Sequence, residues 1–219
     1  GVGVGAMVVT DNREYYERML ICGHLNRANV TEELTRPEYQ VLGKTALGIK
    51  FRSHALAMGL GHAQLPELDA VNEKRRGVLQ QIHEITEEIP GLAPVRVLEK
   101  ATPGGFFGYR LLYQPEDLGG LPVETYVEAL QAEGADVSLC DFPLLHRLPL
   151  FANGFDIDGG DRGPLAGDYS GYQEGDLPVS EAVHKRVLAL PAFTEPRAGV
   201  LDEYREAFRK VAASAGGLL

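Results

Sequence analysis

Residues 47–69 read LGIKFRSHALAMGLGHAQLPELD and carry the strongest helical pattern in the chain. Small apolar residues dominate from His54 to Leu65, which predicts a helix that is apolar on nearly all sides and therefore buried. Pro66 predicts a kink or a restart of that helix. Beyond it, apolar residues recur at steps of three, four or seven from Leu68 onward, which predicts an amphipathic helix that ends at Pro90-Gly91. A buried helix followed by an exposed one indicates that the chain passes from one domain into another.

The residues before this stretch predict a strand, a helix and a long loop. Residues 1–12 read GVGVGAMVVTDN, and the apolar run Ala6–Thr10 predicts a strand, so the glycines do not have the strand–loop–helix context of a dinucleotide-binding loop. A helix capped by Asp11 or Asn12 is expected over Arg13–Gly23. The polar residues 24–48 predict a surface excursion of the length that usually serves a site or an interface.

The remainder of the chain alternates element types, which predicts a small α+β domain with helices on one side of short strands. The expected elements are a strand at Phe106–Tyr113, a helix at Pro122–Glu133, a strand at Asp136–Leu139, an irregular segment at Pro143–Tyr172, helices at Val179–Val187 and Leu201–Ala213, and a frayed C-terminal tail.

Composition excludes several classes of protein. A formal net charge of −10 argues against nucleic acid as a partner, because phosphate binding needs a basic surface. No apolar run approaches the roughly 20 residues that span a bilayer, and no segment resembles a signal peptide. Cys22 and Cys140 are too few and too isolated for a disulfide framework, so buried free thiols in a cytoplasmic protein are expected.

Metal binding and nucleophilic catalysis find little support. The sequence DIDGGDRG places Asp156, Asp158 and Asp161 close together, but it lacks the ligand spacing of a calcium loop and predicts a turn with solvated carboxylates. The histidines show no metal-binding spacing, and no metal site is expected. Neither a GxSxG elbow nor a basic partner for Cys22 beyond His24 is present.

A pair of cations precedes the apolar helix. Lys50 and Arg52 point the same way if residues 49–53 are extended. One interpretation is an anion site, such as a phosphate site, built where the helix begins. The other is two surface cations that flank the helix, and the residues alone leave both open.

The order of segments resembles one known family. The turn into GAMVVT, the helix EYYERMLICGH, the stretch quoted above, FFGYRLLY, DFPLLHRLPLF and LPVSEAVHKRVLALPAF together are similar to sugar and cyclitol aminotransferases of the DegT/StrS type. The resemblance covers essentially the whole chain. It implies an α/β fold, namely the C-terminal part of a pyridoxal-phosphate-dependent transferase fold of the aspartate aminotransferase type. Residues 1–66 would end the large domain, and residues 67–219 would form the connecting helix and the small domain.

The resemblance also implies an activity and a set of site residues. Such enzymes are cytoplasmic homodimers of sugar or antibiotic biosynthesis that bind pyridoxal phosphate and move an amino group from glutamate or glutamine to a keto sugar or keto cyclitol. The family's Gly-x-Asn-Tyr-Arg segment corresponds to LGIKFR, so Lys50 would bind the cofactor phosphate of the neighbouring subunit. Arg52 would lie beside it, and His146 and Tyr109 would face the substrate.

In this register, the lysine that forms the Schiff base would fall two or three residues before Gly1, and none of Lys44, Lys50 and Lys100 takes its place. This chain alone is therefore expected to be inactive and to need the N-terminal portion of the enzyme. Three alternatives stay open: a lysine-free homologue that acts as a partner subunit, a related pyridoxal-phosphate-dependent sugar dehydratase, and a free-standing α/β binding module.

Overall fold

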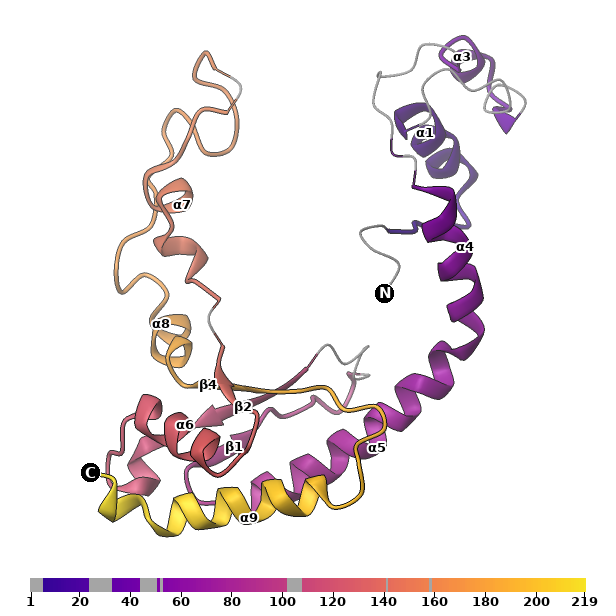
Figure 1. Cartoon of the computed structure of the whole chain (residues 1–219). Helices are drawn as coiled ribbons and strands as arrows, with labels where there is room; N and C mark the ends of the chain where they lie inside the picture. Colours follow the sequence, from indigo (N-terminus) through magenta and orange to yellow (C-terminus); the bar gives the residue numbers. More distant parts are fainter. Residues whose placement is uncertain are drawn as a thin grey trace. The chain divides into compact units, whose positions relative to one another are not determined.

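The computed structural model describes residues 6–23, 33–43, 51, 53–101, 108–140, 142–157 and 159–219. The chain divides into two compact units, Gly1–Leu68 and Asp69–Leu219, called unit 1 and unit 2 below. Figure 1 shows their elements along the chain. Within the described residues, no helix combines the length and apolar character needed to cross a membrane.

Unit 1 is helical in its described part. Helix α1 begins and ends where the sequence predicts, because the Asn12 side chain accepts hydrogen bonds from the backbone N–H groups of Glu14 (3.0 Å) and Tyr15 (3.2 Å). The His54 imidazole caps the second long helix in the same way by accepting from Leu56 N–H at 3.2 Å. The elements are α1 (Arg13–Gly23), α3 (Pro37–Gln40), α4 (Ala55–Gln64) and the 3-10 turn η1 (Leu65–Glu67).

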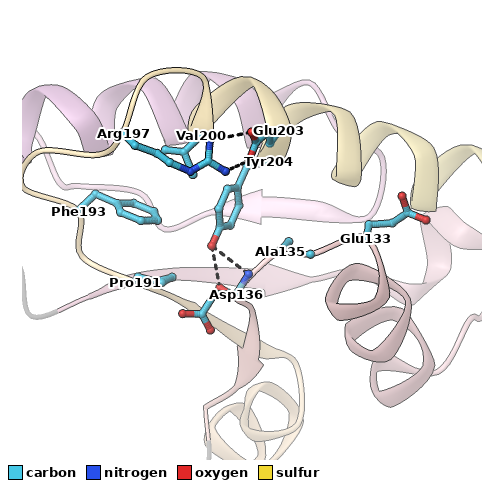
Figure 2. A pocket seen from close by; sticks show the side chains of 10 residues that line it. Glu133, Ala135, Asp136, Pro191, Phe193, Arg197, Val200, Glu203 and Tyr204 are labelled. Atoms are coloured by element: carbon cyan, nitrogen blue, oxygen red, sulfur yellow. Dashed lines mark hydrogen bonds and ion pairs between the residues drawn. The ribbon is translucent and has the colours of Figure 1, made fainter.

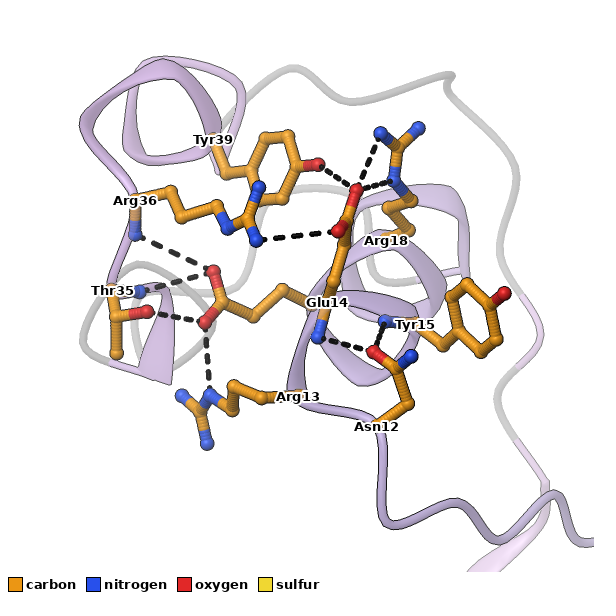
Figure 3. Close-up of polar contacts among 9 residues, drawn as sticks. Asn12, Arg13, Glu14, Tyr15, Arg18, Thr35, Arg36 and Tyr39 are labelled. Atoms are coloured by element: carbon orange, nitrogen blue, oxygen red, sulfur yellow. Dashed lines mark hydrogen bonds and ion pairs between the residues drawn. The ribbon is translucent and has the colours of Figure 1, made fainter.

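A buried carboxylate joins α1 to residues 33–40 (Figure 3). Glu17 is fully buried, and its oxygens accept from the Thr35 hydroxyl (2.5 Å), the Thr35 N–H (3.1 Å) and Arg13 Nε (2.9 Å). These bonds, led by the one from the Thr35 hydroxyl, lower the pKa of Glu17 to about 2. Beside it, Glu14 accepts from Arg18, Arg36 and the Tyr39 hydroxyl. Part of the predicted polar loop is therefore a structured segment, which also buries Leu34 and Tyr39 against Ile21.

The predicted strand at Ala6–Thr10 is wrong for the described chain. These residues form no strand, and Met7, Val8 and Val9 are 79%, 71% and 83% exposed. The physical reason is that a strand needs a neighbour for its backbone hydrogen bonds, and no described residue pairs with this segment.

The helix at His54–Leu65 forms as predicted, but its burial does not. None of the residues of α4 is buried, and Leu56 is 79% exposed. Pro66 lies in the 3-10 turn η1, which separates α4 from α5 (Leu68–Glu87) as its fixed φ predicts. An apolar helix can be buried only if another surface covers it, and no described residue of unit 1 does so.

Unit 2 contains a four-stranded antiparallel sheet with strand order β1-β2-β4-β3. Helices α5 and α9 run along one face of it (Figure 1), and α6 packs on α9. The remaining elements of the unit are β1 (Leu92–Pro94), β2 (Tyr109–Tyr113), η2 (Pro115–Leu118), α6 (Val123–Ala132), β3 (Ser138–Leu139), η3 (Leu145–Arg147), α7 (Pro149–Asn153), α8 (Pro178–His184), β4 (Val187–Leu190), α9 (Val200–Ala213) and η4 (Ala215–Gly217).

The core of unit 2 lies between this sheet face and the helices. Leu111 and Leu188 are fully buried, and Tyr113 stacks on Tyr126 with ring centroids 4.8 Å apart. The Tyr113 hydroxyl donates to the Leu121 carbonyl at 2.8 Å, so the polar tip of this core residue is satisfied. The amphipathic pattern predicted for α5 is confirmed in its second half, where Val78, Leu79, Ile82 and Ile85 are buried.

Three features of unit 2 differ from the sequence predictions. Strands β1 and β4 were not predicted, since β1 is three residues long and the helix predicted at Val179–Val187 extends into the first residue of β4, whereas α8 ends at His184. Residues 145–153, predicted to be irregular, contain η3 and α7. The tail is not frayed, because η4 follows α9 and buries Ala215.

We predict that Glu17 makes the attachment of residues 33–40 to α1 dependent on pH. Its pKa is lowered from 4.5 to about 2, so its stabilising contribution is complete above pH 4.5 and is lost as the pH falls toward 2. The protection of the Thr35 and Arg36 amides against hydrogen exchange, relative to an unfolded chain at the same pH, should therefore fall over that range, and Glu17→Gln should lower it above pH 4.5.

Glu38→Gln is the matched control, because Glu38 is exposed and lies on α3. Equal exchange rates in the two variants would contradict the prediction.

Candidate functional site

The connection between β3 and β4 is the longest irregular part of unit 2. These strands are antiparallel neighbours, and the Cys140 N–H donates to the Val187 carbonyl at 2.8 Å where the connection begins and ends. A pair of this kind can be joined by a few residues, yet residues 140–186 separate them. Phe142, Leu145, Phe155, Ile157 and Val179 are each more than 60% exposed along it. Long connections with exposed apolar side chains commonly carry a binding function.

His146, predicted to face the substrate, is buried at the base of this connection. It is 5% exposed, and its Nε2 lies 2.8 Å from Glu181 Oε1. Glu181 also accepts the Gly175 N–H through both carboxylate oxygens, each at 3.0 Å. The hydrogen bond from His146, followed by that of the Gly175 amide, lowers the pKa of Glu181. One carboxylate thus joins three segments of the connection: η3, the turn at Gly175 and α8.

Tyr109, the second predicted substrate residue, lies at the start of β2. Its hydroxyl is 3.2 Å from Nδ1 of His83 on α5, and burial raises its pKa. Tyr109 and His146 therefore have separate partners, and in the described ranges no hydrogen bond or ring contact joins them. Lys50 and Arg52 lie outside the described residues.

A cavity that the sequence did not indicate lies beside α9 (Figure 2). It measures about 560 Å³ and lies between the residues that follow β4, the approach to β3 and the first turns of α9. The Tyr204 hydroxyl accepts from the Asp136 N–H (3.0 Å) and donates to the Asp136 carbonyl (3.2 Å), while Phe193 packs edge-on against the Tyr204 ring. Arg197 donates to Glu203 at 2.8 Å. The apolar stripe of α9 indicated that Tyr204 packs inward, but its polar partner lies 68 residues away along the chain and left no local signal.

The predicted turn at Asp156–Asp161 is confirmed where it is described. The Asp161 N–H donates to Asp156 Oδ2, and the Gly167 N–H donates to Asp161 Oδ1, both at 2.8 Å. The carboxylates therefore bond to the backbone of the loop, and the expectation that they are solvated is wrong for Asp156, whose Oδ1 is buried. Across the described residues, no three His, Cys, Asp or Glu side chains gather as a metal site would require.

Taken together, a mixed α/β chain in which long helices cover one face of an antiparallel sheet matches solved enzymes of one fold class. These are the aminotransferase TlmJ from Streptoalloteichus hindustanus (18% identity, TM-score 0.55, covering 79% of this chain and 40% of that one), an aminotransferase from Psychrobacter cryohalolentis (18%, 0.65, 95% and 51%) and E. coli GDP-4-keto-6-deoxy-D-mannose-3-dehydratase with bound hydrated PLP (16%, 0.67, 91% and 49%). The chain thus spans about half or less of their length, and the likeness shows a shared fold.

The family follows from the sequence itself. The family model of the DegT/DnrJ/EryC1/StrS aminotransferases matches residues 1–202, so the chain belongs to this family. The resemblance stated from the residues is confirmed. Among curated proteins, no match to the chain was found.

Five hollows among the described residues contain no amine for a covalently bound pyridoxal phosphate. None of the five is lined by a described lysine, and Lys74 and Lys210 bond to Glu195 and Glu133. No step of the cofactor's chemistry is therefore assigned to these residues.

We predict that Glu181 holds the connection between β3 and β4 together. Glu181→Ala removes the acceptor of both His146 and Gly175, so amide exchange at Gly175 should accelerate about tenfold. Because the folded pKa of Glu181 is lowered, the wild-type protection is present above pH 4.5 and declines as the pH falls below it.

Glu174→Ala is the matched control, since the Glu174 side chain is 83% exposed and its ion pair among the described residues is with Arg147 at the surface. If both variants exchange at the wild-type rate, Glu181 does not hold these segments.

Proposed function

We propose that this chain is part of a pyridoxal-phosphate-dependent aminotransferase that moves an amino group from glutamate or glutamine to a nucleotide-linked keto sugar or a keto cyclitol. The observation that carries the proposal is the family match over residues 1–202. The likeness in fold to the aminotransferases TlmJ and that of P. cryohalolentis supports it. The chain would supply the end of the large domain, the connecting helix α5 and the small domain.

Lys50 is the residue proposed to contact the cofactor. A lysine ammonium binds phosphate as a point charge, and a site where a helix begins adds the partial positive charge of the backbone N–H groups. Lys50 precedes α4 by five residues, and in this proposal it binds the phosphate held by the neighbouring subunit. Arg52 would support the same segment.

We propose that His146 and Tyr109 lie near the substrate. The hydrogen-bond partners of the two side chains limit how each could act there. The His146 imidazole is buried against Glu181, so in this conformation it would act by placing the exposed residues of its own turn, of which Leu145 is 64% exposed. Tyr109 would likewise act while its hydroxyl is held by the hydrogen bond to His83.

We also propose that the chain functions in an assembly. Its partners would be the N-terminal portion of the same enzyme and a second copy, with active sites shared in a homodimer. The exposure of Val8, Val9 and Leu56 supports this, because such apolar surface is usually covered in the working protein. Mass determination in solution tests it: a complex that contains a second copy is expected, and a stable monomer in the presence of the N-terminal portion would contradict it.

A second candidate function is a related sugar dehydratase, or a lysine-free partner subunit. The likeness in fold to the E. coli dehydratase favours this alternative. The two functions differ in whether a lysine holds the cofactor covalently.

The test is the absorbance of the purified protein together with the chain that completes it. An aminotransferase should show the visible band of lysine-bound pyridoxal phosphate, lose it on addition of L-glutamate or L-glutamine, and keep the cofactor through denaturation after borohydride reduction. Release of the cofactor on denaturation would favour the lysine-free alternative, and the absence of any cofactor band would contradict both.

Replacing Lys50 tests the phosphate site. Lys50→Gln removes one charge-assisted contact, so the dissociation constant of pyridoxal phosphate should rise about tenfold in equilibrium dialysis. Lys100→Gln removes an exposed lysine and should leave it unchanged. An unchanged dissociation constant in Lys50→Gln would remove Lys50 from the cofactor site.

A further inference from the structure

The face of the unit 2 sheet that points away from the core carries a polar hollow. Along β2, Leu111 and Tyr113 are buried in the core, so Arg110 lies on the opposite face. Along β4, Leu188 and Leu190 are buried, so Ala189 lies on that same opposite face.

The strand register aligns three residues across this face. Arg110 is paired with Ala189, and Ala189 is paired with Ser138 on the edge strand β3. Paired residues of antiparallel strands have side chains on the same face. Because the middle residue is an alanine, space remains between the arginine and the serine, and a hollow of about 300 Å³ lies there.

A carboxylate lines the same hollow. Ala135 and Val137 are buried, so Asp136 and Ser138 alternate with them and are exposed on the other side of the chain. Both bonds between the Tyr204 hydroxyl and the backbone of Asp136 fix this residue in place (Figure 2). The Asp136 side chain has no hydrogen-bond or ion-pair partner within the described part of the chain.

Arg110 is a half-buried cation in a similar position. One guanidinium nitrogen donates to the Tyr109 carbonyl at 3.1 Å, and a Cβ at Gly108 would lie 2.6 Å from that nitrogen, so glycine leaves room for the folded-back side chain. Among the described residues no carboxylate, Asp136 included, lies within ion-pair distance of Arg110. A positive and a negative group thus line one hollow without neutralising each other.

We propose that this hollow binds a free α-amino acid. Arg110 would bind the α-carboxylate through its paired N–H donors, Ser138 would donate a further hydrogen bond, and Asp136 would accept from the α-ammonium group. A guanidinium matches the two oxygens of a carboxylate, and a zwitterion pairs both charges of the hollow at once. A simple anion would satisfy Arg110 but leave its charge beside Asp136. This proposal concerns binding alone and does not depend on the chain being part of an aminotransferase.

The test uses the full chain and three small probes, titrated by isothermal calorimetry and by ¹H–¹⁵N NMR. L-glutamine carries both α groups and an uncharged side chain; glutaramic acid lacks the α-ammonium, and L-glutamine amide lacks the α-carboxylate. We expect L-glutamine to bind at least about tenfold more tightly than either analogue. In the wild-type chain, its addition should shift the amide resonances of Gly108, Ser138 and Ala189.

Two substitutions separate the contributions. Arg110→Gln should weaken L-glutamine binding about tenfold, and Asp136→Asn should weaken L-glutamine binding but not that of glutaramic acid, which has no α-ammonium group for Asp136 to accept from. Arg96→Gln is the matched control, an exposed arginine of the same unit without an ion pair among the described residues. Circular dichroism checks that each variant is folded.

Several results would overturn the proposal. These are no shift of the three amides at millimolar L-glutamine, equal affinity for L-glutamine and glutaramic acid, or full L-glutamine binding by folded Arg110→Gln. Failure of the cofactor tests above would leave these binding results unaffected, so the two proposals can fail separately.

Discussion

The pairing of β2 with β4 is the constraint on which the rest of unit 2 depends. It aligns Leu111 with Leu188, both fully buried, and so places one apolar row against α5, α6 and α9. Since side chains alternate along a strand, the same pairing must place Arg110 and Ala189 on the other face. One set of backbone hydrogen bonds therefore fixes both the core and the hollow at which we propose amino-acid binding.

The pairing of β3 with β4 determines the course of the long connection between these two strands. Adjacent antiparallel strands bring the ends of residues 140–186 together, so the connection must leave the sheet and return to the same place. Its own polar contacts then give it shape, above all the Glu181 carboxylate, which accepts from His146 and Gly175. A buried histidine paired with a carboxylate is a rigid contact, which suits a segment that must present exposed side chains from a long loop.

Unit 1 differs from unit 2 in that much of its apolar surface is exposed and not packed in a core. Its internal contacts include the bonds of Glu17 to Thr35 and Arg13 and a small apolar cluster around Leu34. Its most apolar described segments, residues 6–10 and α4, have no buried residue. The chain corresponds to about half of the solved chains that share its fold. An apolar helix such as α4 gains stability only when apolar surface is removed from water, and for this reason we propose that unit 1 works in a larger assembly.

The sequence by itself determined where several helices begin and end, because capping, proline and helical periodicity act within a few residues. A cap of α1 at Asp11 or Asn12, Pro66 between α4 and α5, and the stripe of α9 were all readable, as was the family, whereas α3 and α7 were not predicted. Only the tertiary structure decided which surfaces meet. The strand predicted at Ala6–Thr10 has no partner among the described residues, while β4 exists because β2 and β3 flank it. Likewise, Arg110, Ser138 and Asp136 share a hollow only because strands distant in sequence are paired, and hydrogen bonds between strands leave no local pattern in the sequence.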